Sequence, residues 1–170
     1  IHRYANGIDN REVELPGEAK SISRETTFAQ DTRDHRFLEA VLRYLCERVG
    51  AELRQQNRQA RSITLKLRYA DFETITRRFS SSEATDTDDV IFAAAVKLLH
   101  QALAEKRKLV RLVGVEASNL VGYDRQLCLL DSMSQRLRCL DKATDRVREK
   151  YGFTSIQTGR TLLLRDIFAS

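Results

Sequence analysis

Apolar and polar residues alternate strictly in one segment of the chain, residues 62–69. Ile63, Leu65, Leu67 and Tyr69 fall on one side, and Ser62, Thr64, Lys66 and Arg68 fall on the other. A period of two is typical of a strand whose side chains point alternately to a buried and a solvent-facing side. The segment therefore predicts a strand with one apolar face and one face of hydroxyls and cations.

Two other segments show the spacing of amphipathic helices. The apolar stripe of the first is Leu38, Val41, Leu42, Leu45, Val49 and Leu53, and that of the second, in residues 90–103, is Ile91, Ala94, Ala95, Leu98 and Leu99. Asp31 or Thr32 can cap the first helix, and its far face carries charged residues that include Arg43, Glu47 and Arg54. Gly50 inside that helix costs about 1 kcal/mol relative to alanine, so either close packing or a weak point is expected there.

Three further strands are predicted, in residues 20–28, 72–80 and 109–115. The turn at residues 70–71 makes the second of them the antiparallel hairpin partner of residues 62–69. Phe72, Ile75 and Phe79 do not share one parity, so a bulge is expected in this strand. Residues 80–89 are small and acidic, which predicts a loop and a cap before the second helix.

The resulting order is strand, helix, strand, strand, helix, strand. Two helices that each bury one stripe, and a sheet with one apolar face, predict an α+β fold. The expected architecture is a two-layer open-faced sandwich: a four-stranded β-sheet with two helices on one face, followed by a helical C-terminal tail. The other face of the sheet would be open to solvent.

The open face is predicted to interleave hydroxyls with cations. The candidates are Ser21, Ser23 or Arg24, Ser62, Thr64, Lys66, Arg68, Thr76, Arg77 or Arg78, and Arg111. Short donors and fixed positive charge suit phosphate oxygens, whereas the face offers no clear aromatic pair of the kind on which RNA-recognition motifs stack bases. An ordinary solvated face explains the same residues, and an RNA-binding two-layer domain is a third hypothesis.

Composition narrows the class of protein. The 170 residues are 42% hydrophobic and 31% charged, with a net charge of +5, which fits one globular domain with tails and a polyanionic partner. No apolar run approaches the roughly 18 to 20 residues of a membrane-spanning helix. The first residues show no secretory signal, so a soluble, cytoplasmic protein with no membrane partner is expected, cut from a longer chain.

No motif predicts catalysis or a metal site. The residue types that carry such chemistry are scattered: Cys46, Cys128 and Cys139, and His2, His35 and His100. They show neither metal-ligand spacing nor a triad arrangement. Asp86, Asp88 and Asp89 fit the acidic N-terminus of a helix better than a metal site.

Four segments, in order along the chain, resemble the C-terminal part of Y-family DNA polymerases of the DNA polymerase IV type. They are residues 7–9, 20–28, 64–72 and 110–115, and residues 140–152 resemble the family's bacterial tail more weakly. The resemblance implies the little finger, a four-stranded sheet with two helices on one side that grips primer-template duplex DNA in translesion, error-prone synthesis. Residues 1–19 would then be the end of the thumb and a linker, 20–120 the little finger, and 121–170 the tail.

For the site, the resemblance implies phosphate contacts by Ser21, Ser23, Arg24, Lys66, Arg68, Thr76, Arg77, Arg78 and Arg111. The palm and fingers, which hold the metal-binding carboxylates and the nucleotide pocket in this family, have no counterpart here. The fragment is therefore expected to be non-catalytic and without a cofactor, with magnesium confined to the missing catalytic core.

Residues 126–130 resemble the short peptides with which bacterial polymerases of this family bind the sliding clamp, with Leu130 in place of the usual Phe. Such a peptide places a Gln amide and apolar anchors in a groove, here Gln126, Leu127, Leu129 and Leu130. A clamp-docking module is thus an alternative function, and an ordinary buried segment is the structural alternative.

A last helix is predicted for residues 134–150. Leu137, Leu140, Thr144, Val147 and Tyr151 recur at helical spacing among many charged residues. Either the final segment, residues 161–168, or another protein is expected to cover this stripe.

Overall fold

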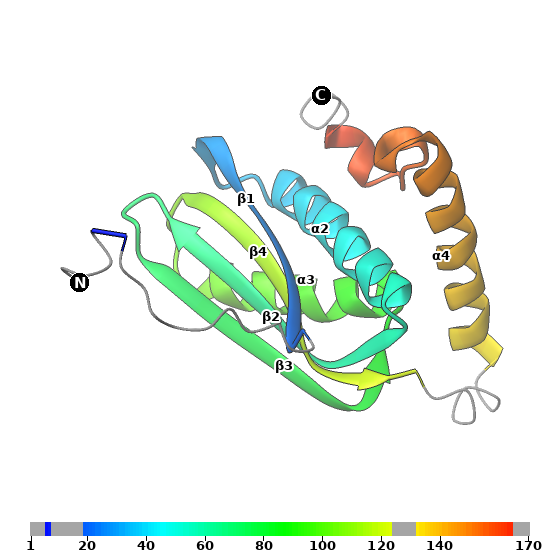
Figure 1. Ribbon diagram of the computed structural model, residues 1–170. Helices are drawn as coiled ribbons and strands as arrows, with labels where there is room; N and C mark the ends of the chain where they lie inside the picture. Colours follow the sequence, from blue (N-terminus) through cyan, green and yellow to red (C-terminus); the bar gives the residue numbers. More distant parts are fainter. Residues whose placement is uncertain (1–5, 8–18, 124–131, 165–170) are drawn as a thin grey trace.

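The computed structural model describes residues 6–7, 19–123 and 132–164, and it shows a sheet, two helices behind it and a further helix alongside (Figure 1). The strands are β1 (Ser21–Thr32), β2 (Arg58–Tyr69), β3 (Thr74–Thr85) and β4 (Val110–Gly122). The helices are α2 (His35–Gln55), α3 (Asp88–Glu105) and α4 (Ser132–Tyr151), followed by the 3-10 helices η2 (Phe153–Ser155) and η3 (Thr161–Leu164). None of the described helices is both long and apolar enough to cross a membrane.

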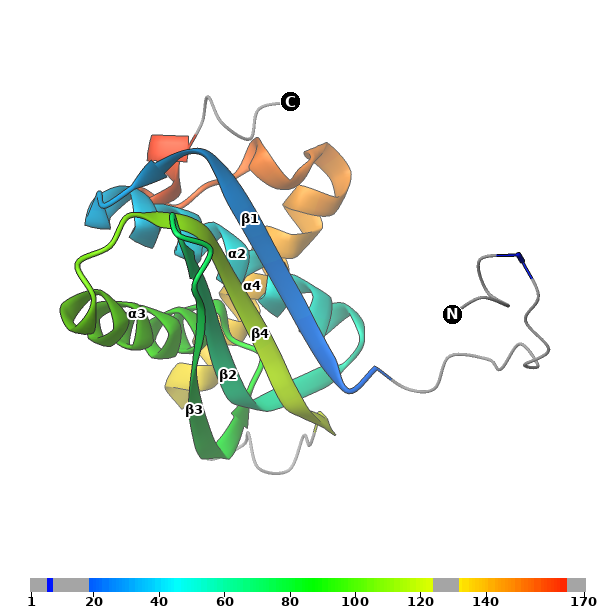
Figure 2. The ribbon, with the colours of Figure 1, turned by 90° about the vertical axis from the view of Figure 1, so that its left-hand side faces the viewer.

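The strands form one antiparallel sheet in the order β1-β4-β2-β3. On one face, α2 lies mainly against β1 and β4 and α3 against β2 and β3, as Figures 1 and 2 show. The residues that fill the space between the layers include those of the alternating strand and of the first helical stripe: Ile63, Leu65, Leu67, Tyr69, Leu38, Val41, Leu42, Leu45, Val49 and Leu53. The predicted α+β class and element order are confirmed.

The element ends differ from the prediction because strand pairing continues further than the hydrophobic pattern. β3 remains paired with β2 as far as Thr85, within the segment that was expected to be a loop. β4 remains paired with β1 and β2 beyond Val115 and ends at Gly122. The cap of α2 is Asp34, whose carboxylate accepts from the backbone N–H groups of Arg36 and Phe37, while Asp31 and Thr32 belong to β1.

The β2–β3 hairpin explains the mixed parity of its apolar residues. Phe72 lies in the turn, outside β3, with a positive φ of 64°. Ile75 and Phe79 pair opposite Leu67 and Ile63 and therefore share the helix-side face. The irregular register lies further along, beyond Ser80, rather than in the segment where the bulge was expected.

The tail helix α4 packs beside α2 through charged side chains. Two pairs join it to α2, Arg54–Asp145 and Arg148–Glu47, with N–O distances of 2.6 and 2.5 Å, and Arg138–Asp86, at 2.7 Å, joins it to the segment before α3. Both α2 partners, Glu47 and Arg54, are almost fully buried, so the far face of α2 is covered. Leu140 and Tyr151, from the stripe that was expected to be covered, are 63% and 65% exposed. Within the described part of the tail, η3 packs against α2 and leaves this stripe exposed, so the final segment does not cover it there; cover by another protein stays a prediction.

Gly50 marks close packing between α2 and the start of α3. A Cβ at this position would overlap Asp88 Oδ1 and lie 3.0 Å from Arg54 Nη1. The expectation of close packing at Gly50 is confirmed.

Candidate nucleic-acid interface

The sheet face away from α2 and α3 carries four cross-strand rows of side chains. In the strand order β1-β4-β2-β3, the rows are Ser21-Ser118-Ser62-Ser80, Ser23-Glu116-Thr64-Arg78, Glu25-Gly114-Lys66-Thr76 and Thr27-Leu112-Arg68-Thr74. We call this surface the open face. Directly opposed residues have Cβ atoms about 4.5 to 5.5 Å apart, so each row forms a continuous strip.

Charge is distributed unevenly over the open face. Its three cations, Lys66, Arg68 and Arg78, lie on β2 and β3, whereas its two carboxylates, Glu25 and Glu116, lie on β1 and β4. The β2–β3 half is therefore the half that favours anions. The structure confirms the predicted placement of Ser21, Ser23, Ser62, Thr64, Lys66, Arg68, Thr76 and Arg78 on this face.

The sequence left open whether Ser23 or Arg24, and whether Arg77 or Arg78, lies on the open face. The strand register puts Ser23 and Arg78 there, and Arg24 and Arg77 on the helix side. The Arg24 guanidinium reaches Glu52 on α2 at 2.6 Å, and that of Arg77 pairs with Glu105 on α3. Successive residues of a strand point to opposite faces, so the residue before Arg24 and the residue after Arg77 take the open-face positions.

Lys66 spans the middle of the open face. Its Nζ donates to Glu25 Oε2 at 2.7 Å, which joins β2 to β1 across the intervening strand β4. The row position on β4 is Gly114, where an added Cβ would come within 2.9 Å of Glu25 Cβ. Glycine thus leaves the space in which this ion pair forms.

Arg68 and Arg78 each bind a neighbouring threonine. Arg68 Nε donates to Thr74 Oγ1 at 3.0 Å, and Arg78 Nε donates to Thr64 Oγ1 at 3.3 Å. A guanidinium has five N–H donors, four of them on its two terminal nitrogens. For these two arginines the terminal nitrogens make no hydrogen bond to another described residue, so they can bind an external anion.

Arg111 lies at the end of the open face, where the β2–β4 register shifts. Its Nη1 is 3.5 Å from Asp31 Oδ1, and its Cζ is 4.9 Å from the centre of the Phe72 ring. The side chain is about 39% exposed, so it is available to a ligand at this edge. The sequence prediction included Arg111 but missed the aromatic ring beside it.

The acidic residues at the start of α3 are ion-pair partners. Asp86 pairs with Arg138, Asp88 with Arg54, and Asp89 with Arg43. Burial, together with the charge of Asp141, raises the pKa of Asp88 to about 7 despite the neighbouring Arg54, and burial also raises the pKa of Asp141. Over the described ranges, no three His, Cys, Asp or Glu side chains come together as a metal site would require.

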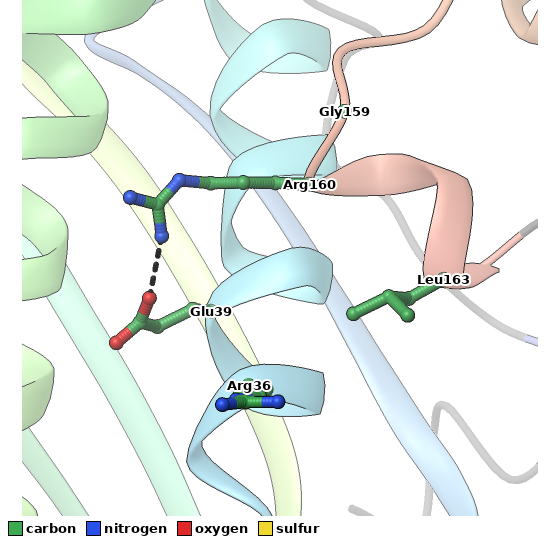
Figure 3. Close-up of a pocket in the computed structure, with 5 residues that line it drawn as sticks. All are labelled: Arg36, Glu39, Gly159, Arg160 and Leu163. Atoms are coloured by element: carbon green, nitrogen blue, oxygen red, sulfur yellow. Dashed lines mark hydrogen bonds and ion pairs between the residues drawn. The ribbon is translucent and has the colours of Figure 1, made fainter.

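An open pocket of about 500 Å³ lies between the first turns of α2 and η3 (Figure 3). Arg36, Glu39, Gly159, Arg160 and Leu163 line it. Glu39 accepts from Arg160 at 2.6 Å and also lies 2.8 Å from His100 Nε2. Its carboxylate is thus already engaged, and no residue of this pocket belongs to the open face.

Three features of the open face were missed by sequence reasoning, namely Glu25, Glu116 and the gap at Gly114. Each is defined by its cross-strand neighbours, which a single sequence does not reveal before the register is known. The predicted clamp-binding residues, Gln126, Leu127, Leu129 and Leu130, lie outside the described residues.

Comparison with known protein families shows which family the chain belongs to. Residues 19–129 match the impB/mucB/samB family C-terminal domain. The chain belongs to this family. One relative, DNA polymerase IV of Dehalococcoides mccartyi, is 50% identical over 164 residues, which cover 96% of this chain and 42% of the relative. The chain therefore spans less than half the length of this curated relative, and the predicted resemblance to Y-family polymerases of the DNA polymerase IV type is confirmed.

Solved structures share the fold. The Dbh DNA polymerase in a post-insertion binary complex superposes with a TM-score of 0.56 at 21% identity, covering 71% of this chain and 34% of that one. A DinB protein from Sulfolobus solfataricus gives a TM-score of 0.54 at 21% identity, covering 60% of this chain and 29% of that one. At this identity the likeness establishes the fold alone, and it is the fold of an impB/mucB/samB C-terminal domain.

Proposed function

We propose that this chain is the DNA-binding little finger of a lesion-bypass DNA polymerase, and that its open face holds primer-template duplex DNA by the sugar-phosphate backbone. The observation that carries the proposal is the open face itself, with hydroxyls in every row and its cations gathered on two neighbouring strands. Family membership supports it, because the relatives are named DNA polymerase IV.

The chemistry of the open face favours the backbone over the bases. Base reading in the major groove relies on bidentate arginine or on Asn and Gln amides. No row position is Asn or Gln, and the two arginines of the rows, Arg68 and Arg78, are each tied through Nε to a threonine of the sheet. Serine and threonine hydroxyls instead donate to phosphate oxygens whatever the sequence. A polymerase that copies damaged templates needs such sequence-independent contacts.

The uneven charge gives the duplex a preferred position. Phosphates are attracted to Lys66, Arg68 and Arg78 on β2 and β3 and repelled by Glu25 and Glu116 on β1 and β4. The sugar-phosphate backbone of the DNA would therefore lie over the β2–β3 half of the open face. When a phosphate approaches Lys66, it competes with the Glu25 carboxylate for the same ammonium group.

Salt-dependent binding to duplex DNA tests this proposal. Each phosphate neutralised contributes about −0.9 to the slope of log affinity against log salt concentration. Lys66→Ala and Arg68→Ala are each expected to weaken binding and to reduce the steepness of that slope by about 0.9. Arg24→Ala and Arg77→Ala are matched controls, because they remove a strand arginine that faces the helices, and they should leave the slope unchanged.

The proposal fails if the unsubstituted chain binds duplex DNA with no salt dependence, or if the controls reduce the slope as much as the open-face variants. A clear preference for single-stranded RNA over duplex DNA would favour the RNA-binding alternative instead.

We propose further that the parent protein is a DNA-directed DNA polymerase whose catalytic carboxylates and magnesium lie outside this chain. The relatives' name and the 42% coverage of the Dehalococcoides protein support this division. The test is to assay primer extension by this chain and by the full-length protein, and extension by the isolated chain would contradict it.

A second proposed function, docking on the sliding clamp, rests on the sequence of residues 126–130 alone. Replacing Gln126, Leu127 and Leu129 with alanine is expected to abolish binding to the bacterial clamp and to leave duplex binding intact. Unchanged clamp binding by this variant would show that the segment has no such role.

A further inference from the structure

Phe72 is an exposed aromatic residue in an unfavourable backbone conformation. Its φ is 64°, a region that bulky residues rarely occupy because the Cβ crowds the backbone. The side chain is nevertheless 65% exposed, so burial in the core does not compensate for the conformation. Strained residues of this kind are concentrated at functional sites.

The turn that carries Phe72 is well fixed. The Phe72 N–H donates to the Tyr69 carbonyl at 2.9 Å, and the Tyr69 N–H donates to the Glu73 carbonyl at 2.9 Å. Asp71 and Glu73, the sequence neighbours of Phe72, both pair with Lys108 on the segment that leads into β4, and Glu73 also pairs with Lys106. The backbone at Phe72 is therefore held in place rather than carried on a loose loop.

The surroundings of the ring indicate what it can bind. Arg111 lies over the ring, with 4.9 Å between its Cζ and the ring centre, and Arg68 and Thr74 of the open face are in the strands that meet at this turn. Lys106 and Lys108 together balance the two flanking carboxylates, so the turn does not repel a polyanion. An aromatic ring with a guanidinium beside it is the combination on which unpaired bases stack.

We propose that Phe72, together with Arg111, is a stacking site for an unpaired nucleobase of the DNA that lies on the open face. This inference rests on the proposed function, because the open face must first bring the duplex to the turn. A base that has left the duplex places its flat face on the exposed ring, and Arg111 binds the adjoining phosphate.

Tryptophan fluorescence tests the stacking directly, because the chain contains no Trp. The Phe72→Trp chain is titrated with a blunt duplex and with the same duplex carrying a single-stranded template overhang. We expect the overhang to quench the emission strongly and the blunt duplex to change it little. Phe79→Trp is the matched control, since Phe79 is also partly exposed (43%) but lies on the helix-side face of β3, and neither DNA should quench it.

A second variant, Phe72→Asn, separates binding from stability. Asparagine tolerates positive φ, so this chain is expected to unfold at a higher denaturant concentration than the unsubstituted protein. Loss of one stacked base should weaken its binding to the overhang duplex about tenfold, with blunt-duplex binding unchanged.

The outcomes are distinguishable. If the blunt duplex does not bind the unsubstituted chain, the proposed function fails. A second outcome refutes the stacking site alone. In it the blunt duplex binds, the overhang duplex does not quench the tryptophan at position 72, and Phe72→Asn binds the overhang duplex as tightly as the unsubstituted chain does.

Discussion

Replacing Gly50 with alanine should destabilise the chain, contrary to the usual effect of that change in a helix. In a helix interior the substitution normally stabilises by about 1 kcal/mol. Here the new Cβ would overlap Asp88 Oδ1 and would lie 3.3 Å from Asp88 Cγ and 3.0 Å from Arg54 Nη1. The Asp88 carboxylate would have to move, and its 2.8 Å hydrogen bond with Arg54 would be lost.

The magnitude follows from the burial of this contact. Overpacking a well-filled interior costs about 1 to 3 kcal/mol, and breaking a buried ion pair costs about 3 to 5 kcal/mol. Arg54 keeps its bonds to Asp145 and to the Asp86 carbonyl, which moderates the second effect. We therefore expect Gly50→Ala to lower the free energy of unfolding by about 3 kcal/mol.

Denaturant titration of four chains measures this effect: unsubstituted, Gly50→Ala, Asp88→Ala and the double variant. Once the Asp88 carboxylate is absent, alanine at position 50 has room, so the double variant should show a coupling energy of about 2 kcal/mol or more. Gly159→Ala is the control, because nothing lies within 4 Å of a Cβ there, and it should change stability by less than about 0.5 kcal/mol. A neutral or stabilising Gly50→Ala would refute the reasoning.

Three more predictions concern charge and reactivity. Glu25→Gln releases Lys66 from its ion pair and should raise duplex affinity about two- to fivefold in a binding titration, whereas a loss of affinity would contradict the proposed competition. Because burial raises the pKa of Asp88 to about 7, the folded chain binds a proton that the unfolded chain, with a pKa of about 3.9, has released. The free energy of unfolding should therefore fall as the pH rises from about 4 to about 7, by up to about 1.4 kcal/mol per pH unit from this group, and Asp88→Asn should flatten that fall in denaturant titrations at several pH values. When the folded chain is alkylated, the exposed Cys139 should react and Cys46 should not, since burial raises the pKa of the Cys46 thiol. Mass spectrometry locates the modified residues, and early modification of Cys46 would contradict its burial.

Most of the sheet and both covering helices could be predicted from residue spacing. The alternation over residues 62–69 places Lys66 and Arg68 correctly, because a strand with one buried face has only one possible parity. The same rule places Arg24 and Arg77 on the helix side once Ile22 and Phe79 are recognised as residues of that side. Treating Phe72 as part of β3 hid that parity, although it belongs to the turn.

The charge pattern of the open face and the packing of α4 could not be predicted, because both depend on contacts between segments that are distant in the sequence. The effect of the two carboxylates on the open face depends on which residues lie opposite them on the neighbouring strands. Those neighbours are set by the strand register, which no local sequence pattern specifies. In the same way, α2 carries Glu47 and Arg54 on a face that resembles a solvated one, and only the arrival of Arg148 and Asp145 from the tail shows that it is covered. Apolar spacing predicted the helix α4 correctly, whereas its contact with α2 is made by charged side chains that this spacing does not single out.

The seam between α2 and α4 has a consequence for how the tail can behave. Paired buried charges add little net stability, because water solvates them almost as well as they bind each other. If α4 separates from α2, the groups wetted at these ion pairs are guanidinium and carboxylate, so the pairs themselves leave no apolar patch behind. The ion pairs of this seam thus fix where α4 lies on α2 while adding little to the net free energy of unfolding.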